Sequence, residues 1–151
     1  ISGNTIRPSY YKDVRGGKTY AEAKFRGNQV TYGKTGELQT ETVGGNISDL
    51  FTLAWQLAAN DAKLPARLSI TNGKKIYPVS GMSKIGSGSY TLNGKTTPIE
   101  KYRIQRGGDT VTYSFATALG NIPAQISYTD DGKTYDLKLT SVKINGKTVK
   151  P

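Results

Sequence analysis

The stretches TNGKK (71–75), LNGKT (92–96), DDGKT (130–134) and INGKT (144–148) decide how this chain folds. Each places Asn-Gly-Lys or Asp-Gly-Lys between segments in which apolar and polar residues alternate. Asn-Gly and Asp-Gly tolerate the positive φ angles of a two-residue hairpin turn, and a following Lys keeps an exposed strand end soluble. The four stretches therefore predict the corners of an antiparallel sheet. The alternative is a ring of turn lysines that meets an anionic surface.

Alternation continues on both sides of these corners and predicts further strands. In the segment 18–34, Ala21, Ala23 and Phe25 fall on one strand face, and Gly27-Asn28 separates that strand from the next. Apolar residues at every second position are typical of a strand with one buried face. The segments with this period are 10–14, 18–34, 68–79, 90–92, 102–104, 111–115, 122–128, 135–139 and 142–144.

The regions between these segments are expected to be irregular. Residues 35–47 and the stretch GSGSY (86–90) are rich in glycine and polar residues, so we expect loops there. The apolar parity shifts between Leu139 and Val142. One extra residue exchanges the two faces of a strand, so this shift predicts a bulge near Thr140-Ser141.

One segment, SDLFTLAWQLAAN (48–60), changes period and predicts a single amphipathic helix over about 48–59. Its apolar residues recur at spacings of three and four, with Ser48 as the expected N-cap and Asn60 at the end. A helix of about three turns is unstable alone, so it must pack on the sheet. We expect Phe51 and Trp55 to lie in that core.

Together these patterns predict a mainly β protein, with one domain over residues 1–151. The expected architecture is an antiparallel, strongly curved sheet of about eight to ten strands, with the helix packed on it. Because most strands have one apolar face, curvature into an incomplete barrel or a sandwich must cover what the helix leaves open.

Composition restricts the chemistry. The 151 residues contain no His and no Cys, which removes the commonest general base, thiol nucleophiles and most zinc sites. The 11 acidic residues include Glu100 and Asp136 on polar strand faces, and nothing in the sequence brings two of them together. We therefore expect no enzyme, no cofactor and no metal. A hydrolase independent of His and Cys is a minor alternative.

The net charge is +10, from 21 Lys and Arg residues against 11 Asp and Glu, which favours anionic partners. A solvated basic surface is the simpler interpretation, because the basic residues are dispersed. The residues of the candidate anion-binding surface are Lys74, Lys75, Lys101, Arg103 and Arg106. Lys101 and Arg103 share a strand face, and the ten tyrosines make nucleic-acid binding an alternative function.

A second candidate site is apolar. If the helix and a curved sheet leave space between them, aromatic residues would line a cavity for an acyl chain or another apolar ligand. The residues expected there are Phe51, Trp55, Tyr113 and Phe115.

Several stretches of the sequence resemble a known protein family. The stretches RGGKTYAEAKFRGNQVTYGKTG (15–36), NISDLFTLAWQLA (46–58), SITNGKKIY (69–77) and NIPAQISYTDDGKTYDLKLTSVKING (121–146) resemble the bacterial domain-of-unknown-function family 3108. The resemblance runs from about Ile6 to Gly146 and implies a β-rich protein exported to the periplasm, with its signal peptide removed. It also implies upstream strands that this sequence lacks, and it supplies no catalytic residues.

These observations lead to one functional expectation. The chain is a non-enzymatic protein of the periplasm or cell envelope that binds an apolar or anionic envelope ligand, such as a lipid-like molecule. No apolar run in the sequence approaches the ~20 residues that span a bilayer.

Overall fold

The computed structural model describes residues 7–92, 94–106, 109–130, 132–138, 142–144 and 147–149. The chain divides into two compact units, residues 1–79 and 80–151, and strand β7 (Ile76–Leu92) contributes residues to both. Each unit contains its own buried apolar residues. The expected single domain over 1–151 stays a prediction.

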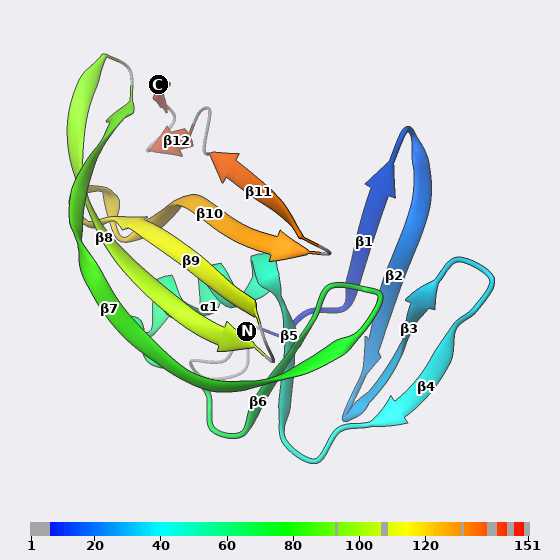
Figure 1. Ribbon diagram of the computed structural model, residues 1–151. Helices are drawn as coiled ribbons and strands as arrows, with labels where there is room; N and C mark the ends of the chain where they lie inside the picture. The colour runs from blue at the N-terminus through cyan, green and yellow to red at the C-terminus, as the bar shows by residue number, and fades with distance from the viewer. Residues whose placement is uncertain are drawn as a thin grey trace. The chain divides into compact units, whose positions relative to one another are not determined.

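The fold is mainly β, with strongly curved strands and one short α-helix, as the sequence predicts (Figure 1). The described residues form thirteen strands rather than eight to ten, because several strands of three or four residues carry no clear alternation. The strands are β1 (Tyr10–Arg15), β2 (Lys18–Arg26), β3 (Gln29–Lys34), β4 (Gln39–Thr42), β5 (Asn46–Asp49), β6 (Leu68–Thr71), β7 (Ile76–Leu92), β8 (Lys95–Arg106), β9 (Asp109–Ala116), β10 (Ile122–Asp130), β11 (Lys133–Lys138), β12 (Val142–Ile144) and β13 (Lys147–Val149). The helices are α1 (Leu50–Ala59) and the single 3₁₀ turn η1 (Thr117–Leu119).

The strands form a four-stranded sheet in the order β1-β2-β3-β4 and a sheet in the order β11-β10-β9-β8-β7-β6-β5. A separate hairpin joins β12 to β13. The strand pairs whose register is described are antiparallel except for β5 and β6, which pair in parallel. This exception follows from α1, since parallel neighbours need a crossover connection and the helix supplies it.

The four-stranded sheet of the first unit has one buried and one exposed face. Ala23, Val30 and Tyr32 are buried, with Tyr11, Phe25, Val43 and Ile76 packed against them. The Tyr32 hydroxyl donates to a Glu41 carboxylate oxygen at 2.6 Å, which ties β3 to β4. Burial raises the pKa of Tyr32 to about 12, and its hydrogen bond to Glu41 adds to the shift. Strands β2 and β3 pair as an antiparallel hairpin, which confirms the prediction from the alternation in segment 18–34.

Helix α1 follows β5 directly and buries Leu50, Leu53, Ala54 and Leu57. These positions recur at three and four residues, so they share one face of the helix. Full burial of such a side chain stabilises the fold by about 1.5–3 kcal/mol. The N-cap is Asp49 rather than the expected Ser48, because a carboxylate oxygen of Asp49 accepts from two backbone N–H groups of the first turn.

The turn that follows β6 is longer than the predicted two-residue corner. Four residues, 72–75, separate β6 from β7. The Asn72 side-chain oxygen accepts from the backbone N–H groups of Lys74 and Lys75, both at 2.9 Å. The Thr71 hydroxyl accepts from the Gly73 N–H at 2.9 Å and donates to the Lys75 carbonyl at 2.7 Å. Side chains thus replace the missing ladder bonds, as Asx and Thr turns do.

This turn is buried, and it joins the two sheets of the first unit. The Gly33 N–H of β3 donates to the Gly73 carbonyl at 2.8 Å. A Cβ on Gly73 would lie 3.3 Å from backbone atoms of Ala21 and Glu22, and φ of Gly73 is +87°. By contrast, Gly94 and Gly132 are exposed, with nothing within 4 Å of the same position. One of the four Asn/Asp-Gly-Lys stretches is therefore a tertiary contact rather than a surface corner.

The second unit is built on the hairpins of β8, β9 and β10. Val111, Tyr113 and Phe115 of β9 are buried, which confirms the predicted alternation. A further cluster of Ile99, Ala116 and Ala124 is packed by Tyr90, Leu119 and Ile122. Figure 1 shows β7 and β8 bending along their length.

Two expected loops are strands. The 35–47 region contains β4 and the start of β5, and residues 86–90 lie within β7. Glycine is tolerated in β7 because strand pairing uses the backbone, and the side chains of Ile99 and Lys101 lie within 4 Å of where a Cβ on Gly88 would be. The bulge expected near Thr140-Ser141 lies outside the described residues.

Replacement of Gly73 by Ala tests whether its turn is a tertiary contact. Gly94→Ala has a similar positive φ in open space, so it should lower the free energy of unfolding by about 1–2 kcal/mol. Gly73→Ala must also displace the backbone of β2 and should cost roughly 1–3 kcal/mol more. Urea denaturation of both variants measures the difference. Equal losses would show that the Asn72-Gly73 turn is an ordinary surface corner.

Candidate functional site

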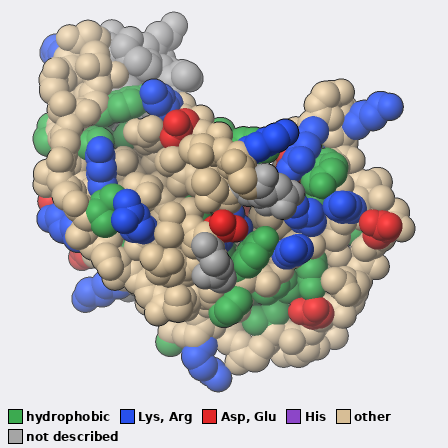
Figure 2. Space-filling model, in the orientation of Figure 1, with side chains coloured by type: hydrophobic (Ala, Val, Ile, Leu, Met, Phe, Trp, Pro, Cys, Tyr) green, Lys and Arg blue, Asp and Glu red, His purple; other side chains and the backbone are tan. Residues whose placement is uncertain are grey.

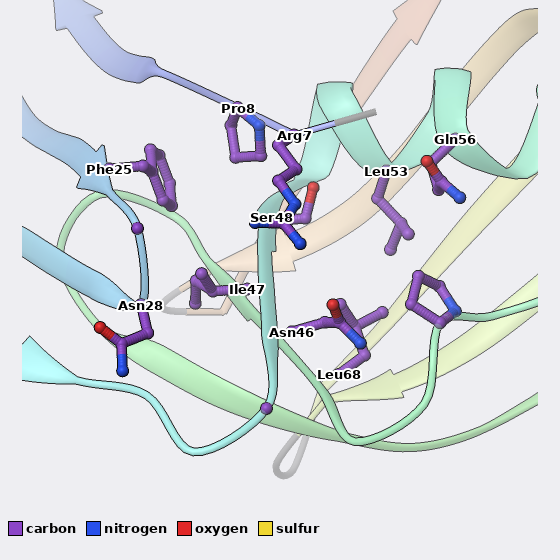
Figure 3. A pocket seen from close by; sticks show the side chains of 13 residues that line it. Arg7, Pro8, Phe25, Asn28, Asn46, Ile47, Ser48, Leu53, Gln56 and Leu68 are labelled. Atoms are coloured by element: carbon purple, nitrogen blue, oxygen red, sulfur yellow. The ribbon is translucent and has the colours of Figure 1, made fainter. Parts of the chain in front are cut away.

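The first unit contains a pocket of about 230 Å³ between the β2–β3 turn, β5 and helix α1 (Figure 3). Its lining combines apolar side chains, amides, one hydroxyl and one guanidinium. The lining residues are Arg7, Pro8, Phe25, Gly27, Asn28, Gly45, Asn46, Ile47, Ser48, Leu53, Gln56, Pro65 and Leu68. The volume lies below the ~300–1,000 Å³ that is usual for drug-sized ligands, so the pocket suits a small molecule.

Backbone hydrogen bonds fix the walls of the pocket. The Val43 N–H donates to the Asn28 carbonyl at 2.7 Å, which holds the β2–β3 turn against the segment before β5. On the opposite side, the Asn46 N–H donates to the Arg67 carbonyl at 3.1 Å, and the Asn46 side-chain amide donates to the Ala66 carbonyl at 2.7 Å. These bonds hold β5 in place on this side of the pocket.

Gly45 is required at this wall. A Cβ at residue 45 would lie 2.2 Å from the Arg67 carbonyl oxygen, a separation that no side chain can adopt. The pair Gly44-Gly45, immediately before β5, is the sequence feature that indicates this close approach. It lies in the segment 35–47, for which the sequence predicts a loop. Glycine between two regular elements often marks a close approach of two backbones.

The lining of the pocket mixes apolar and polar side chains. Leu53 and Leu68 line the pocket and are buried, and the polar lining residues Ser48 and Gln56 are also almost fully buried. Arg7, an exposed residue, lines the pocket together with Ser48 (Figure 3). Arg7 is the one ionisable side chain among the described lining residues. The set can hold a ligand and pair with a negative charge, but it offers no general base for proton transfer.

Asp49, next to Ser48, is buried at the start of α1. Its carboxylate accepts from the Phe51 and Thr52 N–H groups at 2.9 and 2.7 Å and from the Thr52 hydroxyl at 2.8 Å. Desolvation by burial raises the pKa of Asp49, and the three hydrogen bonds oppose that shift without cancelling it. The carboxyl is therefore held in place by the helix end and faces no partner charge in the described residues.

The residues of the expected apolar cavity fall in different units. Tyr113 and Phe115 are buried in the second unit, where their rings stack with centroids 6.2 Å apart. Phe51 and Trp55 belong to α1 in the first unit and do not line the pocket. A cavity that joins the four residues stays a prediction.

The expectation that Phe51 and Trp55 lie in the core is wrong. Their exposed fractions are 39 % and 50 %. The helix has more apolar residues than one buried face can hold, and Leu50, Leu53, Ala54 and Leu57 occupy that face. Phe51 and Trp55, four residues apart, lie together on its flank. Phe51 stacks on Tyr11 of β1, with ring centroids 5.9 Å apart.

The expected anion-binding residues also belong to different units. Lys74 is half-buried and Lys75 is exposed in the first unit, while Lys101 is half-buried and Arg103 exposed on β8. Whether any of them binds an anion stays a prediction.

The assignment of Arg106 to that surface is wrong. Arg106 is fully buried, and its guanidinium donates to the Thr129 carbonyl at 2.9 Å. The reason is strand parity: Arg106 shares a face of β8 with buried Ile104, whereas Lys101 and Arg103 lie on the other face.

The remaining candidate groups give no catalytic arrangement. Glu100 pairs with Lys84 at 3.1 Å, and Asp136 lies opposite Ser127 in the β10–β11 pair. In the part of the chain that the structure describes, no three potential metal ligands lie together. Nor is any described helix long and apolar enough to cross a membrane.

The pH dependence of Asp49 is testable. Because its pKa is raised, the folded protein retains a proton that the unfolded chain loses near its ordinary value of 3.8. Stability should therefore fall as pH rises from about that value through the folded pKa. Asp49→Asn keeps an N-cap oxygen but does not titrate, so the stability of the native protein relative to this variant should decline over that window. Urea denaturation across acidic pH measures it, and a relative stability that rises with pH would contradict the assignment.

Comparison of the chain with protein-family models gives no match, and comparisons with curated proteins and with solved structures give none either. The resemblance to family 3108 therefore stays a prediction.

Proposed function

We propose that this chain is a non-enzymatic binding protein whose first unit holds a small ligand with an apolar body and an anionic group. The observation that carries the proposal is the pocket, whose lining includes the Arg7 guanidinium together with the apolar side chains of Leu53 and Leu68. Buried apolar area supplies affinity, and a few convergent polar groups fix orientation. This ligand combines the two kinds expected from the sequence, apolar and anionic.

The residues that line the pocket favour a binding function over a catalytic one. Ser48 has neither a neighbouring base nor an acid to orient one among the described lining residues. Nucleophilic catalysis by a hydroxyl needs such a base within hydrogen-bond reach. The amides of Asn28, Asn46 and Gln56 can instead donate to ligand oxygens.

The location of the protein is a separate proposal. On the resemblance to family 3108 alone, we place it in the bacterial periplasm, where the ligand would be an envelope component such as a lipid-like acid. Nucleic-acid binding stays the alternative, since the net charge of +10 favours any polyanion.

Octanoate, a short acyl chain with a carboxylate, is a suitable probe for calorimetric titration. Replacement of Arg7 by Gln removes a charged hydrogen-bond donor of the kind worth about 1.5–3 kcal/mol, so octanoate affinity should fall at least about tenfold. Octanol, which has the same chain without the charge, should bind the native protein and Arg7→Gln equally. This contrast separates the guanidinium from the apolar surface.

Arg103→Gln is the matched control, because it removes the same charge from an exposed residue of the second unit. Its octanoate affinity should equal that of the native protein. If both variants lose affinity equally, the effect is one of net charge. If octanoate does not bind the native protein, the pocket does not take this class of ligand.

A further inference from the structure

The exposed face of the four-stranded sheet carries cations from two neighbouring strands. In β2, Ala21 and Ala23 are buried, so the even-numbered residues point to the opposite side. Strand register places Tyr10 of β1 opposite Lys24, and Lys12 opposite Glu22, and such pairs share a face. We call this surface the outer face. Its residues are Tyr10, Lys12, Arg15, Lys18, Tyr20, Glu22, Lys24, Arg26, Gln29, Thr31, Thr40 and Thr42.

The outer face is strongly positive. Lys12, Lys18, Lys24 and Arg26 are all exposed. Lys12, Lys24 and Arg26 form no ion pair with any residue in the described ranges. Glu22 is the one acidic residue in the set, and it accepts a hydrogen bond from the Tyr10 hydroxyl. Figure 2 shows basic side chains gathered over β1 and β2.

The residues of the outer face on β3 and β4 have polar, uncharged side chains, and most of these are short. On β3 and β4, the hydroxyls of Thr31 and Thr40 lie 2.8 Å apart and hydrogen-bond to each other across the strands. Glu41 points the other way, toward Tyr32. On β3 and β4, therefore, neither a bulky apolar group nor an unpaired carboxylate interrupts the outer face.

The arrangement of the cations indicates the geometry of the partner. Lys24 and Arg26 are about 6.6 Å apart along β2. Lys12 lies opposite Glu22 on β1, and neighbouring strands are about 4.8 Å apart. The charges thus form a two-dimensional array on a sheet face, not a line within a groove of the kind that follows a nucleic-acid backbone. Tyr10, which is half exposed, has the amphipathic ring that favours a membrane–water boundary.

From this charge and geometry we infer that the outer face docks the first unit on an anionic lipid surface. Each basic residue at such a surface strengthens binding about fivefold, and the attraction weakens with salt. Arg26 directly precedes Gly27 and Asn28, which line the pocket. Docking through the outer face would bring that wall of the pocket close to the headgroups. The inference does not depend on ligand binding by the pocket.

Vesicle co-sedimentation tests the inference. The protein should bind vesicles of phosphatidylcholine that contain about 30 % phosphatidylglycerol at low salt, and not vesicles of pure phosphatidylcholine. The triple variant Lys12→Gln, Lys24→Gln, Arg26→Gln should lower partitioning roughly a hundredfold, about fivefold for each residue. All three side chains are exposed, so the variant should fold, and circular dichroism checks that it does.

The matched control is Lys63→Gln, Lys95→Gln, Lys133→Gln, which removes three exposed charges elsewhere and leaves the same net charge. It should keep most of the vesicle binding. Equal losses in the two triple variants would overturn the outer face as the docking surface. Absence of vesicle binding by the native protein would also overturn the inference. If the native protein instead bound a single-stranded oligonucleotide, and the Lys12, Lys24, Arg26 variant did not, the outer face would be a nucleic-acid surface. Arg7→Gln should bind vesicles nearly as well as the native protein.

Discussion

The first unit depends on the hydrogen bond from the Gly33 N–H to the Gly73 carbonyl. Gly33 belongs to a sheet of local hairpins, and Gly73 belongs to the turn that joins β6 and β7. Few side chains could be accommodated there, because both residues have positive φ and backbone atoms lie close to where each Cβ would be. The contact holds the β2–β3 hairpin beside β6, and β6 pairs with β5. The glycine-to-glycine contact therefore adds to the hydrogen bonds of Val43 and Asn46 that hold the two walls of the pocket.

The sequence predicted the elements whose side chains alternate, and failed where the backbone alone decides. The hairpin at Gly27-Asn28 and the buried parity of Val111, Tyr113 and Phe115 followed from period-two patterns. Strand β4, with all four residues exposed, has no apolar face to detect. Residues 86–90 pair as a strand although their composition is typical of a loop. Propensity describes side chains, whereas strand pairing uses the main chain.

The candidate sites were harder to predict for a related reason. Arg106 looks like a surface residue by type, yet its strand parity buries it with Ile104. Trp55 looks like a core residue by type, yet its helix position places it on a flank. In both cases the position in the periodic element, rather than the residue type, decides exposure. The pocket could not be predicted, because its lining comes from segments that only tertiary contacts bring together.

The pocket and the outer face share the β2–β3 turn. On the outer side, Arg26 and Gln29 end the two strands, and on the other side Gly27 and Asn28 line the pocket. A short turn held by the Val43 N–H is a rigid connection, so the two surfaces keep a fixed relation. A small amphipathic ligand and an anionic lipid surface would thus meet the protein on adjacent sides of one hairpin end.

The close approach of Gly45 to Arg67 restricts how this protein can change over generations. The carbonyl that excludes a side chain at residue 45 is also the one that accepts from Asn46, and Arg67 itself has a φ of +47°. Substitution of Gly45 by any other residue therefore requires a compensating shift of the backbone at residues 66–67. The Asn46 side chain holds that backbone in place through a hydrogen bond. The wall of the pocket at β5 is therefore constrained by backbone contacts, whereas lining side chains such as Arg7 and Gln56 are not subject to this constraint.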